Sequence, residues 1–412
     1  MEIGDFEKME PNIAVGLEST LDIVITFPSL EELEKFSTTY KGELSNQVKK
    51  GYEKVADGLG GEIPIDGRGK EAKNMIRLAE EKGAEISRSI GGNGAQEAIT
   101  LTNFGARSFF TGGVSKELFS KFSKKDREIL NKVDTSYSEK FEKYSPASYI
   151  LQAPGTNRFI FSEGKGRRIN QLRSYIKKLP ETISKISREH GGLDAISLAG
   201  LQVLFGNKLT KKDFQLMKNI IQDIRNRTDA LLFADAGGMG GLSEIEKERL
   251  CKIYLLFDTL STNEDEIEEI SQKISIEGED QIEKMKKLIE TSNYLSTLWL
   301  HAADFQTSIS TVFSENKLKK AQKTAALAGL YRVEKGGYPT WKKLSHWQKN
   351  RNINKKGIEK VENIRNKYGE QEGIKIAITS CYEPKEFTST VGAGDISAAA
   401  YLYSLIQKTL DF

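Results

Sequence analysis

Cysteine and histidine are scarce in this sequence. Its 412 residues include two cysteines, Cys251 and Cys381, and three histidines. Two cysteines are too few for a disulfide framework and are typical of a reducing compartment. None of the histidines stands in a paired spacing, so the sequence predicts no zinc site.

Long apolar segments and a strong excess of one charge are also missing. No stretch approaches about 20 uninterrupted apolar residues, so no membrane-spanning helix and no membrane partner are expected. The N-terminal segment is acidic and lacks the apolar core of a signal peptide, which predicts a cytoplasmic protein. The 61 Lys and Arg residues nearly balance the 58 Asp and Glu residues, leaving a net charge of +3. This balance does not indicate a nucleic-acid partner.

Two basic clusters with interleaved aromatic residues stand out locally, at residues 207–215 and 341–360. Such clusters usually form a solvated face of a folded protein, and we interpret both in that way. Nucleic-acid binding is the less favoured alternative.

The composition is that of a folded protein, with 38% hydrophobic and 29% charged residues. The length predicts a large domain with a smaller one beside it. At least five strands alternate with helices, which favours a doubly wound α/β fold with its functional residues at the carboxyl edge of the sheet. Residues 12–27 are expected to be rich in β-structure, and residues 85–114 to form a βαβ unit. Residues 279–324 are expected to be helical.

A glycine-rich turn near the C-terminus is the most informative feature of the chain. In residues 389–405 the backbone N–H groups of Gly392, Ala393 and Gly394 can converge on an anion at the start of a helix. Asp395 would repel a resting phosphate there unless it has a chemical task, such as taking a proton from an attacking hydroxyl. The alternative is an ordinary helix cap, but a strand-like run at residues 374–380 favours the phosphate site.

Two further places offer groups for a polyol ligand. Asp22 ends the expected opening strand and can accept hydrogen bonds from two sugar hydroxyls. Gly91 and Gly92 allow a ligand to come close, and Asn93 adds a donor and an acceptor. The structural alternatives are a turn or cap aspartate and a tight strand-to-helix turn.

Three more segments carry residues suited to Mg²⁺ and phosphate. Asn263 and Glu266 stand three apart at an expected helix start, where both can reach a phosphate-bound Mg²⁺ through its water shell. An acidic first turn that complements the helix dipole is the alternative. Asp235 closes an apolar strand and is a second residue for positioning Mg²⁺. Arg158, an isolated strand arginine, can bind a transferred phosphate with two hydrogen bonds, or pair with a nearby acid.

Taken in order, these segments resemble the ADP-dependent sugar kinases, the archaeal-type glucokinase and 6-phosphofructokinase group of the ribokinase-like superfamily. The similarity extends over residues 12–408 in one collinear order. It rests on LESTLDIV, SIGGNGAQEAITL, TNRFIF, ISLAGLQ with Gly200 and Gln202, DTLSTNEDEIEEI, TLWLHAADF with His301, and TVGAGD. The histidine of TLWLHAADF lies on a helix in this expectation.

The resemblance implies a ribokinase-like doubly wound sheet flanked by helices, with a smaller β-rich lid domain. The large domain would be made mainly of residues 1–22, 86–112 and 190–412. The lid would come from approximately residues 23–85 and 113–189.

The resemblance also implies Mg²⁺-dependent transfer of the β-phosphoryl group of ADP to a sugar or sugar phosphate in carbohydrate metabolism, giving AMP. Asp395 would be the catalytic base. Phosphate and nucleotide binding would involve Gly392, Ala393, Gly394, Asn263, Arg158, His301 and the loop from Cys381 to Phe387. The sugar would be bound by Asp22, Gly91, Gly92, Asn93 and Gln202, and Mg²⁺ by Glu266 and Asp235.

Two departures from the family pattern concern the acceptor. The family usually has H-x-E where this chain has Phe233, Ala234 and Asp235, so the acid has a shorter arm and the histidine is lost. The opening asparagine of the family is replaced by Glu18 or Ser19. Two alternatives therefore stay open: an ATP-dependent ribokinase-like sugar or nucleoside kinase, and a catalytically degenerate protein that binds nucleotide or sugar.

Overall fold

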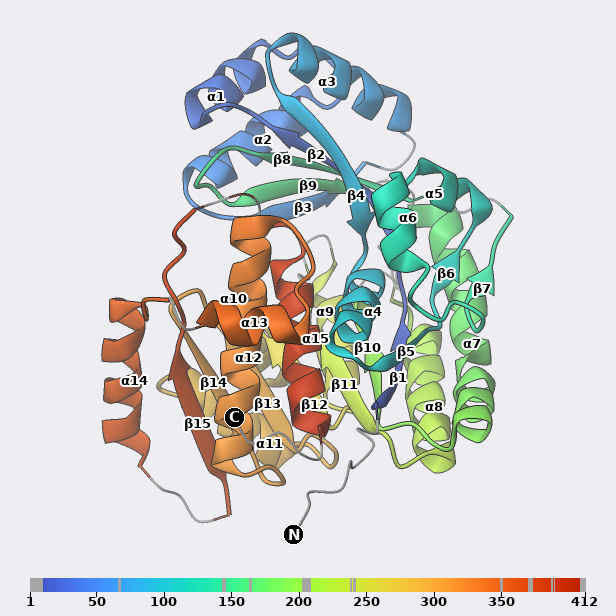
Figure 1. The fold of residues 1–412 in the computed structure, drawn as a ribbon, viewed down its shortest axis with the longest axis vertical. Coiled ribbons are helices and arrows are strands. Elements are labelled where there is room, and N and C mark those ends of the chain that lie inside the picture. Colours follow the sequence, from blue (N-terminus) through green and yellow to red (C-terminus); the bar gives the residue numbers. More distant parts are fainter. Residues whose placement is uncertain are drawn as a thin grey trace.

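A large and a small β-sheet, each with its own helices, make up the molecule (Figure 1). The computed structural model describes residues 10–65, 68–142, 146–162, 165–201, 209–237, 239, 242–348, 351–369, 373–386, 388 and 390–407. Within these residues no helix is both long enough and apolar enough to cross a membrane.

The large sheet has eight strands in the order β15-β14-β13-β12-β11-β10-β1-β5. All pairs are parallel except β13 with β14 and β14 with β15. Its strands are β1 (Asn12–Gly16), β5 (Arg107–Phe110), β10 (Ala195–Leu198), β11 (Leu231–Asp235), β12 (Thr259–Thr262), β13 (Thr297–His301), β14 (Phe305–Ser310) and β15 (Lys375–Ser380).

The small sheet has five strands in the order β3-β9-β8-β2-β4. These are β2 (Thr20–Thr26), β3 (Gly61–Pro64), β4 (Glu85–Gly91), β8 (Ala147–Gln152) and β9 (Arg158–Ser162). A separate two-stranded sheet pairs β6 (Gly113–Val114) with β7 (Glu139–Lys140).

Fifteen helices are assigned within the described residues. They are α1 (Leu30–Thr39), α2 (Ser45–Ala56), α3 (Gly69–Glu81), α4 (Asn93–Phe104), α5 (Lys116–Lys121), α6 (Lys124–Leu130), α7 (Lys165–His190), α8 (Lys211–Arg227), α9 (Glu244–Tyr254), α10 (Glu264–Ile274), α11 (Gln281–Thr291), α12 (Glu315–Lys335), α13 (Trp341–Trp347), α14 (Lys355–Tyr368) and α15 (Ala393–Ile406).

The large sheet is covered by helices on both faces, as a doubly wound fold requires. Successive side chains of β1 point to opposite faces, so Ile13 and Val15 join one core and Ala14 joins the other. The first core includes apolar residues of α4, α12 and α15. The second includes those of α7 to α11. The expected α/β architecture with a smaller β-rich part is confirmed.

The carboxyl edge of the large sheet faces the small sheet. The chain leaves β1 at Gly16 and enters β2 of the small sheet at Thr20, after only three residues. Because β1, β10, β11 and β12 run parallel, their carboxyl ends lie at this same edge. Residues at those ends therefore meet residues of the small sheet.

Three expectations about local structure were wrong. Residues 12–27 are β-rich, as expected, and form two strands in different sheets, but Asp22 lies inside β2 rather than at a strand end. Residues 85–114 do not form a βαβ unit of one sheet, because β4 pairs antiparallel with β2 while β5 joins the large sheet. The polar residues along β4 suit its place at the edge of the small sheet, where one side stays accessible.

The segment 279–324, expected to be helical, contains α11, then β13 and β14, and then the start of α12. His301 is consequently the last residue of a strand and not part of a helix. β-Branched and aromatic residues in TLWLH and FQTSIS favour the strands. The proposed boundaries of the large domain and the lid stay a prediction.

Candidate active site

A group of charged side chains lies where the two sheets meet. Asp22 of β2 and Arg158 of β9 come from the small sheet, and Asp395 of α15 and Arg332 of α12 come from the large one. The charges of Asp395, Arg332 and Arg158 all act on the pKa of Asp22. Four residues far apart in the sequence thus share one site.

The start of α15 provides the glycine turn that the sequence predicts. Gly392 precedes the helix with φ at 75°, in the left-handed region that favours glycine. A Cβ at this position would stand 1.7 Å from Oε1 of Gln96 on α4. Among the described residues no side chain caps this helix. The N–H of Ala393 donates to the carbonyl oxygen of Thr390 at 3.1 Å, and the neighbouring N–H groups of the turn can bind an anion.

Asp395 lies in the first turn of α15, beside those N–H groups. Burial raises the pKa of its carboxyl, while the positive charges of Arg158 and Arg332 lower it. The two arginines therefore favour the ionised form that a general base needs.

Asp22 is the buried acid on the small-sheet side of the site. It is 5% exposed and accepts a hydrogen bond of 3.0 Å from the Thr20 hydroxyl. Burial raises the pKa of Asp22 to about 7, against the effect of the Thr20 hydrogen bond and of both arginines. A Cβ on Gly91 would stand 1.8 Å from Oδ1 of Asp22, so glycine leaves room for this carboxylate.

The Gly91–Asn93 turn brings α4 close to the start of β2. Gly92 has φ at 85°, and a Cβ there would stand 2.8 Å from the carbonyl oxygen of Glu18. The Asn93 side chain faces Gly200, which follows β10 at the carboxyl edge. The tight turn is as expected, and its part in sugar binding stays a prediction.

A second group of acids lies deeper along the same edge. Asp235 ends β11, as expected, and is 5% exposed with no hydrogen-bond partner for Oδ1 among the described residues. Burial raises the pKa of Asp235 to about 7, and the charge of Asp395 acts in the same direction. The acids at Asp235 and Asp395 are therefore close enough to repel each other.

Asn263 and Glu266 form the start of α10, as the sequence predicts. Their side chains bond each other's backbone N–H at 2.9 Å, which is a capping box. Burial and the charge of Asp235 raise the pKa of Glu266 well above its usual value. The pair is thus a helix cap that also faces the second acid group.

Glu97 is a site residue that the sequence analysis missed. It lies on α4, is completely buried, and accepts a hydrogen bond from the Ser197 hydroxyl through Oε2. Its Oε1 has no hydrogen-bond partner in the described part of the chain. Burial raises the pKa of Glu97 well above its usual value, helped by the charges of Asp235 and Asp395. The only signal in the sequence is a polar pair, Gln96 and Glu97, inside an otherwise small and apolar helix start.

Arg332 was missed as well. It is 5% exposed on α12, donates from Nε to the carbonyl oxygen of Val391 at 2.8 Å, and lies over the Tyr338 ring at 5.1 Å. Val391 directly precedes Gly392, so Arg332 holds the entrance to the glycine turn. Nothing in the sequence around Arg332 distinguishes it from a surface arginine of a helix.

Direct coordination of a metal by protein side chains alone is not available in this site. Among the described residues, no three His, Cys, Asp or Glu side chains are arranged to hold an ion. The partnerless oxygens of Asp235 and Glu97 nevertheless suit a cation that arrives with phosphate oxygens and water. The donor set therefore fits a nucleotide-bound Mg²⁺.

His301 is not brought into this group. The His301 ring lies 4.8 Å from that of Trp299, and burial lowers its pKa to about 4 without a contribution from any site acid. Gln202 lies outside the described residues, as does Phe387 at the end of the expected nucleotide loop.

Comparison with known proteins gives one family and a set of similar folds. The model for the ADP-specific phosphofructokinase/glucokinase conserved region matches residues 11–403. No curated protein matches the chain by sequence.

Several solved structures resemble it along nearly the whole chain. An ADP-dependent kinase in complex with fructose-6-phosphate and ADPβS has a TM-score of 0.73 at 14% identity, covering 96% of this chain and 94% of its own. A hypothetical ADP-dependent phosphofructokinase from Pyrococcus horikoshii OT3 has a TM-score of 0.69 at 13% identity. The match covers 97% of this chain and 98% of that protein. The last common ancestor of ADP-dependent phosphofructokinases from Methanosarcinales has a TM-score of 0.68 at 14% identity. The match covers 98% of this chain and 96% of the ancestor. These likenesses confirm the expected fold.

Proposed function

Because this chain belongs to the family of ADP-specific phosphofructokinases and glucokinases, we propose that it transfers the β-phosphoryl group of ADP to a hydroxyl of a sugar or sugar phosphate. AMP is the second product. The observation that carries this proposal is Asp395 at the uncapped start of α15, with Asp22 and two arginines facing it. This arrangement offers a base, a phosphate cradle and a hydroxyl-binding acid in one place.

The proposed reaction is an in-line displacement at the β-phosphorus. The acceptor hydroxyl lies between Asp22 and Asp395, and Asp395 takes its proton as the new oxygen–phosphorus bond forms. The bond between the β-phosphorus and the bridging oxygen breaks, and that oxygen leaves with AMP. The N–H groups of Gly392, Ala393 and Gly394 stabilise the negative charge on the phosphoryl oxygens.

The two arginines have different proposed tasks. Arg158 stands on a strand of the small sheet and would bind the transferred phosphoryl group. Arg332 is already bonded to Val391, so it positions the glycine turn and favours ionised Asp395.

Mg²⁺ is part of the proposal. Bound with the nucleotide, the ion would neutralise phosphate charge. Asp235 and Glu266 would hold it through water, and the partnerless oxygen of Glu97 makes that residue a third candidate.

The remaining residues are assigned by the family resemblance. We propose that the sugar contacts Gly91, Gly92, Asn93 and Gln202 in addition to Asp22. We propose that nucleotide recognition uses Asn263, His301 and the loop that begins at Cys381. The fructose-6-phosphate and ADPβS bound to a structure of the same fold suit both sets.

The test is AMP release from ADP and Mg²⁺ against a panel of sugars and sugar phosphates, with ATP in a parallel series. AMP formed with one acceptor supports the proposal and identifies the substrate. Turnover with ATP alone contradicts it and indicates a ribokinase-like ATP-dependent kinase. Stabilisation by nucleotide or sugar without any AMP indicates a binding protein.

A further inference from the structure

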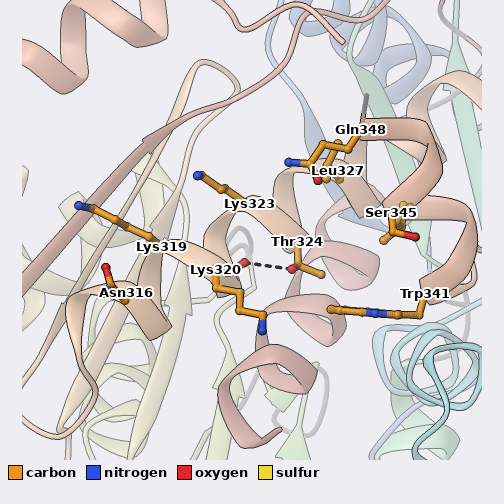
Figure 2. A pocket seen from close by; sticks show the side chains of 10 residues that line it. Asn316, Lys319, Lys320, Lys323, Thr324, Leu327, Trp341, Ser345 and Gln348 are labelled. Atoms are coloured by element: carbon orange, nitrogen blue, oxygen red, sulfur yellow. Dashed lines mark hydrogen bonds between the residues drawn. The ribbon is translucent and has the colours of Figure 1, made fainter. Parts of the chain in front are cut away.

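The helix α13 packs across the N-terminal half of α12, and the two enclose a pocket of about 350 Å³ (Figure 2). This pocket is separate from the site at the glycine turn. From Lys323 in the pocket to Arg332 at the turn, α12 advances nine residues, about 13 Å along its axis. The lining consists of Asn316, Lys319, Lys320, Lys323, Thr324 and Leu327 of α12, and Trp341, Leu344, Ser345 and Gln348 of the α13 segment.

The charged side chains that line the pocket are positive. Three lysines and no acidic residue are among the described residues that line it. Lys319 pairs with Glu315, whereas Lys323 has no ion pair in the described part of the chain. Burial lowers the pKa of the adjacent Lys317, and the charge of Lys320 lowers it further. An anion bound here would relieve this crowding of like charges.

The opposite wall of the pocket is apolar and flat. Figure 2 shows the Trp341 ring at one side of the pocket, with the end of Lys320 near it and the ends of Lys319 and Lys323 directed away from it. Trp341 is held in place by rings behind it, edge-on to Phe104 at 5.7 Å and tilted against Tyr403 at 5.4 Å. Leu344 of the α13 segment extends this wall, and Leu327 adds an apolar side chain on the α12 side. A bare inorganic ion would leave these surfaces unused, but a ring would cover them.

We propose that this pocket binds a small phosphorylated molecule with a flat ring, of the size and chemistry of a mononucleotide. The flexible side chains of Lys320 and Lys323, which Figure 2 shows extended in different directions, turn toward the phosphate, and the ring lies against Trp341 and Leu344. Ser345, Gln348 and Asn316 supply hydrogen-bonding groups at the rim. The segment 341–360, interpreted from the sequence as a solvated basic face, therefore supplies one wall of a binding site.

The experiment is isothermal titration with AMP, pyrophosphate and adenosine on the full chain. The test variant is Lys320→Gln with Lys323→Gln. The matched control is Lys355→Gln with Lys356→Gln, two exposed lysines of α14 that do not line the pocket. Pyrophosphate tests the charge alone, adenosine tests the ring alone, and AMP carries both.

We expect the pocket to bind AMP more tightly than pyrophosphate, and to bind adenosine hardly at all. The test variant should weaken AMP binding there by about tenfold or more, the scale of a lost charge-assisted contact. The control variant should bind as the unchanged protein does. Thermal stability and turnover of both variants should match the unchanged protein, because neither pair belongs to the active site.

AMP is also the product of the proposed reaction, so the two sites are separated by stoichiometry. If both proposals hold, the unchanged protein binds two AMP and the test variant loses one. If only the pocket exists, one AMP binds and the test variant loses it. AMP binding with equal stoichiometry and affinity in the unchanged protein and the test variant would overturn the pocket proposal.

Discussion

Single buried charges define the chemistry of the site. Burial raises the pKa of Asp395, and two guanidinium groups oppose part of this rise. Asp22 and Asp235, which are equally buried, have pKa values of about 7. The two arginines thus favour the ionised form of Asp395, which a general base at the glycine turn needs.

Arg332 gives the first prediction. In Arg332→Gln the pKa of Asp395 rises, because one of the two charges that lower it is gone. Since the base must be ionised, the acidic limb of the pH profile of kcat/KM should move to higher pH by roughly one unit. Arg332→Lys keeps the positive charge and should leave this limb near its original position. Equal profiles for the Gln and Lys variants would rule out an electrostatic role.

Asp235 gives a prediction about stability. Its pKa rises from 3.8 to about 7 on folding, so the folded state binds the proton more tightly between these values. The contribution of Asp235 to stability is therefore fully present below pH 4, falls as the pH rises to 7, and is lost above it. Asparagine does not ionise, so Asp235→Asn should be more stable than the unchanged protein at pH 8, by on the order of 2 kcal/mol.

Denaturant unfolding without Mg²⁺ at pH 4 and pH 8 measures this difference. It should shrink toward pH 4, where Asp235 is protonated in both states. A difference that is absent at pH 8, or larger at pH 4, would show that burial of Asp235 is not the cause.

Residues in recognisable turns could be predicted from the sequence, and isolated ones could not. Asp395 stands next to two glycines, and Asn263 and Glu266 have the spacing of a helix start. Glu97 and Arg332 lie within helices without such neighbours. Their importance comes from distant partners: Glu97 bonds Ser197, 100 positions away, and Arg332 bonds Val391, 59 positions away.

Helix starts are the elements that place the functional groups. The starts of α4 and α15 lie against each other, with Gln96 of α4 beside Gly392. The start of α10 is closed by its own capping box, whereas no described side chain caps α15. An uncapped helix start between other elements is costly unless a ligand binds it, which suits a phosphate site.

The conformation of Gly392 provides a prediction at this scale. In Gly392→Ala the φ of 75° is strained, by about 1 kcal/mol, and the new Cβ displaces the Gln96 side chain. The glutamine can move aside, so the protein should fold with a small loss of stability. The N–H groups of the turn should lose their alignment, weakening ADP binding by about tenfold.

The matched control for this experiment is Gly394→Ala, where an added Cβ meets no atom within 4 Å and the backbone is helical. This variant should retain more ADP affinity than Gly392→Ala. Titration calorimetry and thermal unfolding measure both effects. Equal ADP affinity in Gly392→Ala and the unchanged protein would show that the turn does not hold the phosphate.

Elements with a strong local pattern were predicted correctly, and those whose partner lies far away were not. The strand β11, ending at Asp235, is apolar and short, as a central parallel strand should be. The strands β13 and β14 were mistaken for part of a helix because they follow α11 closely and form an antiparallel pair at the far side of the sheet. The assignment of β4 and β5 to different sheets depends on pairing that no local pattern encodes.

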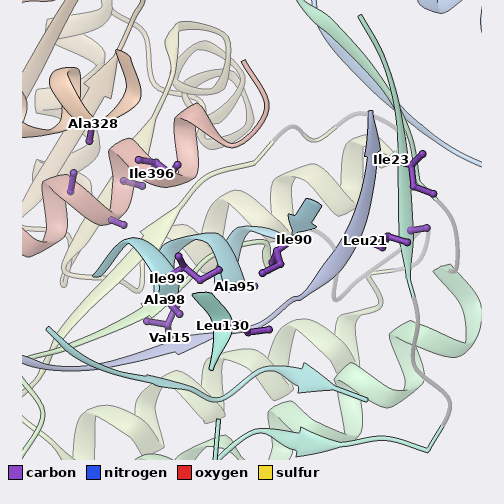
Figure 3. Close-up of a cluster of buried hydrophobic side chains, with 14 of the residues drawn as sticks. Val15, Leu21, Ile23, Ile90, Ala95, Ala98, Ile99, Leu130, Ala328 and Ile396 are labelled. Carbon is purple, nitrogen blue, oxygen red and sulfur yellow. The ribbon is translucent and has the colours of Figure 1, made fainter. Parts of the chain in front are cut away.

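At the scale of the whole molecule, α4 packs against strands of both sheets, β1 and β5 of the large sheet and β4 of the small one. Figure 3 shows one apolar cluster with Val15 of β1, Leu21 of β2, Ile90 of β4 and Ala98 of α4. Ile396 of α15 belongs to the same core. The base and the acid that faces it are therefore carried by elements that share a core, which keeps their spacing well defined.

The most direct test of the central claim is label transfer from [β-³²P]ADP to the acceptor sugar, by the unchanged protein and by Asp395→Asn. The account predicts that the label appears on the sugar in equal amount to AMP. It also predicts that Asp395→Asn lowers kcat by roughly 10²–10⁴ while ADP binding is retained, as expected for loss of a general base. Label found only in free phosphate, or a variant that keeps its rate, would contradict the account.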